Sequence, residues 1–154
     1  MRAGTATALV ATAALSVSSW GMTACPASAA TLPMRVTTMP KACPAKSLVA
    51  SALKQKSTAT SSLGAGGKYL NCSYTTAAGE ASVIFSFPYP AAAFSKTRSV
   101  ALESGAVAVK VGDQAYVIKS ANELLALSGK LEMVISAPKA GVAQLVALGK
   151  AILG

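Results

Sequence analysis

Histidine is absent from this chain of 154 residues. Its absence removes the side chain that most often acts as a general base or binds a metal ion near neutral pH. Cysteine is scarce as well, and the pair Cys43 and Cys72 offers too few soft ligands for a structural zinc site. The sequence therefore predicts no metal site and no cofactor.

Acidic residues are also few, since 5 Asp and Glu face 14 Lys and Arg. The segment 35–68 carries cations only. The basic residues stand singly without interleaved aromatics, so the pattern does not predict a nucleic-acid partner. A net charge of +9 is compatible with attraction to anionic lipid or to acidic cell-wall polymers. The scattered single cations favour an ordinary solvated surface over that attraction.

Familiar catalytic patterns are missing. Residues 51–54 match S-x-x-K, but neither an S-D-N nor a K-T-G companion follows, so we interpret them as an exposed helix face. Glu123 and Glu132 are expected on adjacent strands of a polar face, as solvated charges rather than an acid–base pair. Gly112-Asp113 is typical of a tight turn. The sequence therefore predicts a protein without enzymatic activity.

The first 29 residues have the pattern of a secretory signal peptide. Arg2 supplies the positive charge, residues 6–17 form an uncharged apolar run, and Ala27-Ser28-Ala29 provides small residues before a cleavage site. The apolar run is too short for a permanent membrane anchor. We therefore expect a signal peptide at 1–29, a linker or tether at 30–41 and a single domain at 42–154.

Met22-Thr23-Ala24-Cys25 offers a second interpretation of the same segment, because it resembles a bacterial lipobox. Ala24 suits its position, whereas Met22 stands where leucine is usual. Cys25 would then be lipidated and become the new N-terminus, held to the outer face of the membrane by two or more acyl chains. Both interpretations predict export.

The cysteines form an even pair once Cys25 is removed or lipidated. Cys43 and Cys72 then remain in an oxidising compartment, where disulfides persist. Their spacing is unlike the C-x-x-C of redox-active pairs. We therefore predict a structural disulfide, which closes a loop of roughly 30 residues and stabilises the fold by about 3.6 kcal/mol in the chain-entropy model.

Hydrophobic periodicity predicts an α+β fold. A helix is expected from Pro44, and the Ser-, Thr- and Gly-rich segment 55–67 is expected to be a flexible loop. The other expected elements follow in chain order: a hairpin of strands 69–75 and 81–87, a helix at 91–103, a meander of strands at 107–111, 115–118, 124–127 and 131–135, and a helix from Ser136 or Pro138. Together they predict a twisted antiparallel sheet, hairpin plus meander, with three helices covering one face and one disulfide.

Several short motifs resemble those of a known group of proteins. They are Asn-Cys-Ser-Tyr (71–74), Val-Gly-Asp-Gln-Ala-Tyr (111–116), Leu-Glu-Met-Val-Ile-Ser (131–136) and Gln-Leu-Val-Ala-Leu-Gly-Lys-Ala-Ile (144–152). Over residues 42–152 the chain resembles small exported lipoproteins and secreted domains of actinobacteria that carry a domain of unknown function. The resemblance implies a paired disulfide, export, frequent lipid anchoring and no known catalysis, and it favours Cys25 as the lipid site.

Three functions are compatible with these features. The first is a non-catalytic, exported binding domain, extracellular or lipid-anchored, that recognises an envelope component or a partner protein and meets the membrane only through its anchor. The second is a carrier of an apolar ligand, in a cavity lined by Phe85, Phe87, Phe94 and Met133. The third is a hydrolase of unfamiliar type, which requires convergent Ser, Lys and acidic groups.

Overall fold

The computed structural model describes residues 38–63 and 67–154. The predicted signal peptide, Cys25 and residues 30–37 of the predicted tether lie outside the described residues. Signal cleavage and lipidation therefore stay predictions.

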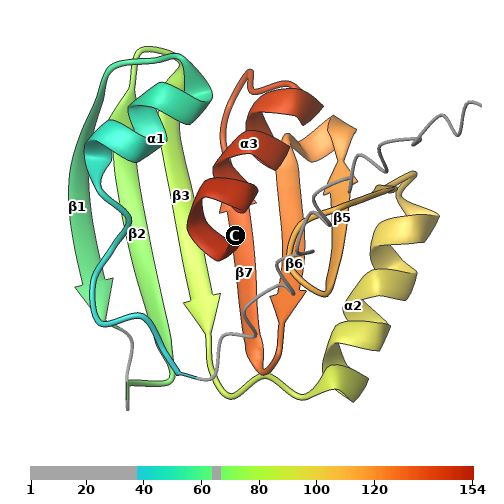
Figure 1. Cartoon of the computed structure of the whole chain (residues 1–154). Helices are drawn as coiled ribbons and strands as arrows, with labels where there is room; N and C mark the ends of the chain where they lie inside the picture. Colours follow the sequence, from blue (N-terminus) through green and yellow to red (C-terminus); the bar gives the residue numbers. More distant parts are fainter. Residues whose placement is uncertain (1–37, 64–66) are drawn as a thin grey trace, which may run out of the picture. The chain divides into compact units, whose positions relative to one another are not determined.

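A single antiparallel sheet organises the fold (Figure 1). Its strands are β1 (Ser57–Leu63), β2 (Tyr69–Thr76), β3 (Gly79–Ser86), β4 (Val107–Val109), β5 (Gln114–Ile118), β6 (Glu123–Ser128) and β7 (Leu131–Ser136). Their order in the sheet is β1-β2-β3-β7-β6-β5-β4. Two meanders, β1 to β3 and β4 to β7, thus meet where β3 pairs with β7.

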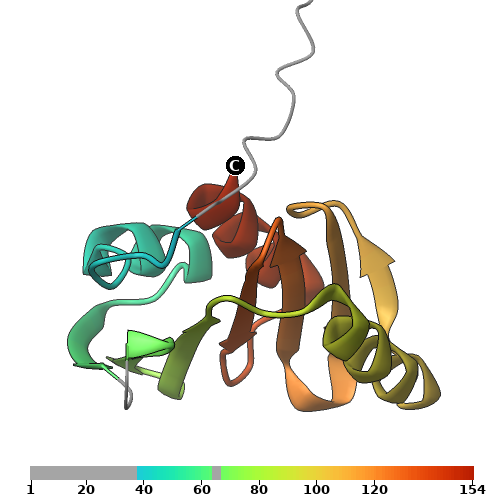
Figure 2. The same ribbon diagram turned by 90° about the horizontal axis from the view of Figure 1, so that it is seen from below.

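Three helices complete the domain: α1 (Lys46–Leu53), α2 (Ala91–Glu103) and α3 (Val142–Leu153), with a 3-10 turn, η2 (Lys119–Ala121), between β5 and β6. Helices α1 and α3 pack together over one face of the sheet, and α2 lies beside the opposite face near β5 (Figures 1 and 2). The predicted α+β architecture with an antiparallel sheet and three helices is confirmed.

The main core lies between the sheet and the pair α1 and α3, which we call the first face. Alternation along the strands sends every second side chain into this core. Helix α1 contributes Val49 and Leu53, and α3 contributes Leu145, Leu148 and Leu153. The largest buried strand residues of this core are Leu70, Tyr74, Phe85, Leu124, Leu131, Met133 and Ile135.

A smaller cluster occupies the second face, where Phe94 of α2 packs with Tyr116 and Leu127. The prediction that helices cover only one face was therefore wrong. Strands β5 and β6 carry apolar residues on both faces, because Tyr116 alternates with the core residues Ala115 and Val117. Their second face needs a cover, and α2 provides it.

The segment 55–67 was predicted to be a loop, and this prediction was wrong for residues 57–63. They form β1, an edge strand whose backbone pairs with β2 in antiparallel register from Ser57 opposite Thr76 to Leu63 opposite Leu70. Its sequence lacks the apolar alternation that marks a strand, so the signal was absent. Backbone hydrogen bonds to an existing strand, together with the β preference of threonine, hold such an edge in place.

The last helix begins at Val142, later than the predicted start at Ser136 or Pro138. Lys139 takes a left-handed backbone conformation with φ of 60°, which a helix cannot contain. Gly141 stands before the first turn, and its N–H donates to Gln144 Oε1 at 2.9 Å. Gln144 Nε2 in turn donates to the Leu53 carbonyl at 2.6 Å, so one side chain begins α3 and ties it to the end of α1.

The predicted disulfide is confirmed: Cys43 and Cys72 are bonded, with their Cα atoms 5.6 Å apart. It fastens the segment before α1 to β2, and Tyr74 reinforces the connection because its hydroxyl donates to the Pro44 carbonyl at 2.7 Å. Within residues 38–63 and 67–154, helices of the length and apolar content needed to cross a membrane do not occur.

Candidate functional site

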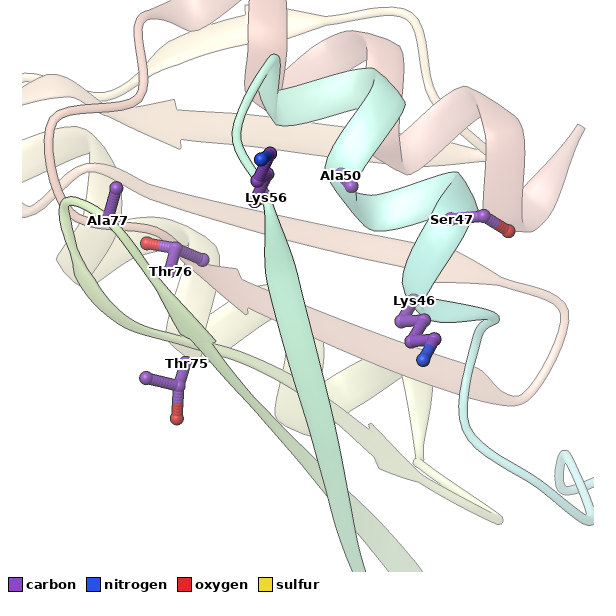
Figure 3. A pocket seen from close by; sticks show the side chains of 7 residues that line it. All are labelled: Lys46, Ser47, Ala50, Lys56, Thr75, Thr76 and Ala77. Atoms are coloured by element: carbon purple, nitrogen blue, oxygen red, sulfur yellow. The ribbon is translucent and has the colours of Figure 1, made fainter.

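A hollow of about 550 Å³ lies between α1, the start of β1 and the end of β2 (Figure 3). It is lined by Lys46, Ser47, Ala50, Lys56, Thr75, Thr76 and Ala77. Two of these residues bring ammonium groups and three bring hydroxyl groups, and none brings a carboxylate. We call this feature the lysine hollow.

The local sequence explains the composition of the lysine hollow. Val49 and Leu53 of α1 are buried in the core. Lys46 and Ala50 of the same helix line the hollow. Lys54 ends α1 in a left-handed conformation with φ of 56°. That reversal directs the chain into β1 and places Lys56 at the other side of the hollow (Figure 3).

One hydroxyl group of the hollow, that of Thr76, already makes hydrogen bonds within the protein. Thr76 Oγ1 donates to the Gly79 carbonyl at 2.7 Å and accepts from the Ala78 N–H at 3.2 Å, so it serves the β2–β3 turn.

The lining residues of the hollow include two lysines and no carboxylate, although the exposed Glu80 lies opposite Thr75 on β3. The two lysines make the hollow attractive to anions. Lys46 and Lys56 belong to the segment 35–68, which carries cations only, so the hollow gives the predicted basic character a definite location.

A second hollow, of about 320 Å³, lies between α2 and the second face of the sheet, and we call it the α2 groove. Its lining residues are Thr97, Val100, Ala101, Ser104, Ile118, Glu123 and Leu125. Glu123 is the acidic member. Burial raises the pKa of the Glu123 carboxyl above its ordinary value.

Glu132 lies on the same face and is only 7% exposed. Burial raises the pKa of its carboxyl, while hydrogen bonds from Tyr89 and Ser86 act in the opposite direction. Tyr89 also lies within hydrogen-bond distance of Thr97, with 3.3 Å between their hydroxyl oxygens. The prediction of a solvated Glu132 was therefore wrong, because α2 and the chain leading into it cover this end of the face.

Glu123 and Glu132 do not form a pair. Glu123 lies opposite Ser136, whereas Glu132 lies opposite Leu127. The two carboxylates are thus offset by four residues along the strands, or about 13 Å. A proton cannot pass directly between them.

The other predicted residues are separated by the fold. Phe85 and Met133 are packed in the first-face core and Phe94 in the second-face cluster, so they do not line one cavity. Ser51 and Lys54 are both exposed at the end of α1. Neither the lysine hollow nor the α2 groove joins serine, lysine and a carboxylate.

Sequence reasoning missed both hollows, because each combines segments that are distant in the chain. One signal was present. The seven strands contain no Lys or Arg, and their acids, Glu80, Glu123 and Glu132, alternate with residues of the first-face core. A carboxylate beside Leu124 and Leu125 in an apolar strand is unusual enough to indicate a special environment.

Comparison with family models, curated proteins and solved structures finds no match to this chain. The resemblance to exported actinobacterial lipoproteins therefore stays a prediction.

Proposed function

We propose that this protein is a non-catalytic, exported binding domain of the cell envelope, anchored through a lipid on Cys25, that holds a phosphodiester-bearing anion at the lysine hollow. The disulfide supports the compartment, because structural disulfides are typical of oxidising environments outside the cytoplasm. The signal-like residues 1–29 point the same way.

One observation carries the proposal: two exposed lysines, Lys46 and Lys56, line a hollow whose lining residues include no carboxylate. Lysine ammonium groups bind phosphates as compact point charges. The lysines stand at separate sides of the hollow, so an extended anion with repeated charges suits it better than one isolated ion. A wall polymer and the headgroups of an anionic membrane both offer that chemistry.

Titration with a soluble phosphodiester polymer tests this function. We expect binding by the mature protein that weakens as salt is added, since screening reduces attraction between exposed charges. Replacing both lysines (Lys46→Gln with Lys56→Gln) should weaken binding roughly 30-fold, on the basis of about 1 kcal/mol for each lysine near an anionic surface.

The matched control is Lys110→Gln with Lys130→Gln, which removes the same charge. Both residues are exposed, and Lys130 lies in the β6–β7 turn, near the far end of β3 from the hollow. Equal losses in the two double variants would show attraction by net charge alone and contradict a defined site. Vesicles with and without anionic lipid, used as a second titrant, separate the membrane from the polymer as the source of the anion.

A further inference from the structure

Glu123 sits in the α2 groove without a partner. Its carboxylate makes no hydrogen bond or ion pair with any residue of 38–63 or 67–154, and burial alone accounts for its raised pKa. Glu123 is only partly buried, and its carboxylate oxygens are not among the sealed side-chain atoms of the described residues, so a ligand can reach them. A partly buried carboxylate at the edge of a groove, with no donor from the described residues, is a candidate acceptor for a ligand.

Nearby cations do not fill this role. Arg98 on α2 directs its guanidinium to the ring of Tyr116, 5.7 Å from the ring centre. Lys119, next to Ile118, is exposed and forms no ion pair with Glu123. Glu132 has its own donors, Ser86 and Tyr89, at the other end of the face.

The two hydroxyls that line the groove are already engaged. Thr97 Oγ1 donates to the Ala93 carbonyl at 3.3 Å, and Ser104 Oγ donates to the Val100 carbonyl at 3.0 Å. Their protons are thereby directed into α2. Glu123 is the charged group among the residues that line the groove, so it is the strongest acceptor that a cationic ligand would meet there.

The remaining walls of the groove are apolar. Leu125 forms the buried side, Ile118 lies opposite Glu123 on β5, and Val100 projects from α2 with 63% of its surface exposed. An exposed valine on the lip of a groove is an apolar contact without an occupant. The volume of about 320 Å³ lies at the small end of ligand pockets, roughly 300–1,000 Å³.

We propose that the α2 groove binds a primary amine on an aliphatic stem, with its ammonium donating to Glu123 and its stem against Val100, Ile118 and Leu125. An ammonium is a compact charge with three donors, and its methylene stem packs well on apolar surface. This site is separate from the lysine hollow and carries the opposite charge. A negative result for the α2 groove would leave the proposed function at the lysine hollow unaffected, and the reverse also holds.

Three small probes separate the two halves of this recognition: n-hexylammonium, n-hexanol and methylammonium. We expect only n-hexylammonium to produce saturable shifts in the backbone NMR signals of α2, β5 and β6 of the mature protein. Hexanol keeps the stem without the charge, and methylammonium keeps the charge without the stem. Hexanol binding as tightly as hexylammonium would overturn the proposal.

Variants test the residues. Glu123→Gln should weaken hexylammonium binding at least tenfold, and Val100→Ser should weaken it severalfold. The matched control is Glu103→Gln, which removes the same charge from an exposed position on α2, and it should bind as the unaltered protein does. Unchanged binding in Glu123→Gln overturns the site. If Glu123→Gln fails to fold, Val100→Ser is the deciding variant, because Val100 is exposed and outside the core. Unchanged hexylammonium binding in Val100→Ser would then overturn the site.

Discussion

Glu132 and Glu123 both lie on the second face of the sheet, where Glu132 is buried and Glu123 is half-buried. Glu132 receives hydrogen bonds from Ser86 and Tyr89, whereas Glu123 receives none within the described part of the chain. Burial raises the pKa of both, so the folded state favours their protonated forms. Their contribution to stability is therefore greatest at low pH and is lost as pH rises through the raised pKa.

Glu123→Gln should stabilise the protein at neutral pH, because glutamine carries no charge that needs water. The gain should shrink as the pH falls through the raised pKa of Glu123, because the folded state then takes up the proton, and it should be largely lost below about 4.3, the ordinary pKa of glutamate, where both folded and unfolded states are protonated. Urea unfolding at pH 7 and pH 4 measures the difference. Glu103→Gln, on an exposed residue, is the control, and an equal gain there would assign the effect to net charge.

Gly149 marks a close approach between α3 and the sheet. A Cβ atom at this position would lie 2.7 Å from Leu124 Cδ2 and 2.9 Å from Val111 Cγ1. Both neighbours are buried, and a valine side chain has little rotational freedom. The helix can lie this near the sheet because glycine has no side chain.

We expect Gly149→Ala to destabilise the fold although alanine is the better helix former. Overpacking costs about 1–3 kcal/mol, which exceeds the gain of about 1 kcal/mol in helix propensity. Ala147→Gly, at an exposed position of the same helix, reports the propensity alone and should cost about 1 kcal/mol. Denaturant unfolding measures both variants. A more stable Gly149→Ala would show that the side chains of Leu124 and Val111 move aside at little cost.

At the scale of elements, α1 is a short helix held from both ends. The disulfide and the Tyr74 hydrogen bond hold the chain before it, and Gln144 holds its last carbonyl. Helices of eight residues are marginal by themselves. Tertiary attachment therefore maintains α1, and with it the position of the lysine hollow.

Removing the disulfide by Cys43→Ser with Cys72→Ser should lower the free energy of unfolding by about 3.6 kcal/mol, the loop entropy of roughly 30 residues. Urea unfolding of the variant is the measurement. The unaltered protein under reductant is the control, because it loses the bond but keeps both cysteines. A loss below 1 kcal/mol in both samples would contradict the role of the disulfide as the main restraint on α1.

The sequence predicted correctly the elements that have a clear hydrophobic periodicity. It did not predict elements that lack such periodicity. The helix at 91–103 matches α2 in both bounds, because Pro90 and Ser104-Gly105 punctuate it clearly. Strand β1 escaped prediction since its pairing with β2, rather than its own residues, makes it a strand. The same holds for the α2 groove, whose lining residues span from Thr97 to Leu125.

At the scale of the whole molecule, charge is divided between surfaces. The strands hold acids and no bases, whereas lysines occupy helices and connecting segments. The two proposed sites follow this division, with the lysine hollow proposed for anions and the α2 groove for an amine.

Export and anchoring can be tested on the intact molecule. We expect mass spectrometry of the mature protein to find lipid on Cys25, as the lipobox-like segment and the family resemblance favour. An N-terminus at Ala30 would instead establish free secretion and contradict the anchor. Cys25→Ser is the control, because it should abolish lipid attachment without altering the Cys43–Cys72 bond.

The sequence by itself determined the class of fold, the disulfide partners and the excess of positive charge. These follow from local periodicity, from the parity of cysteines and from composition, all of which are properties of the chain in order. Only the tertiary structure decided that β1 is a strand, that α2 covers the second face and that Glu123 lies in a groove without a donor. Each of these depends on contacts between segments distant in sequence, and burial, which sets the pKa of Glu123, exists only once those segments have met.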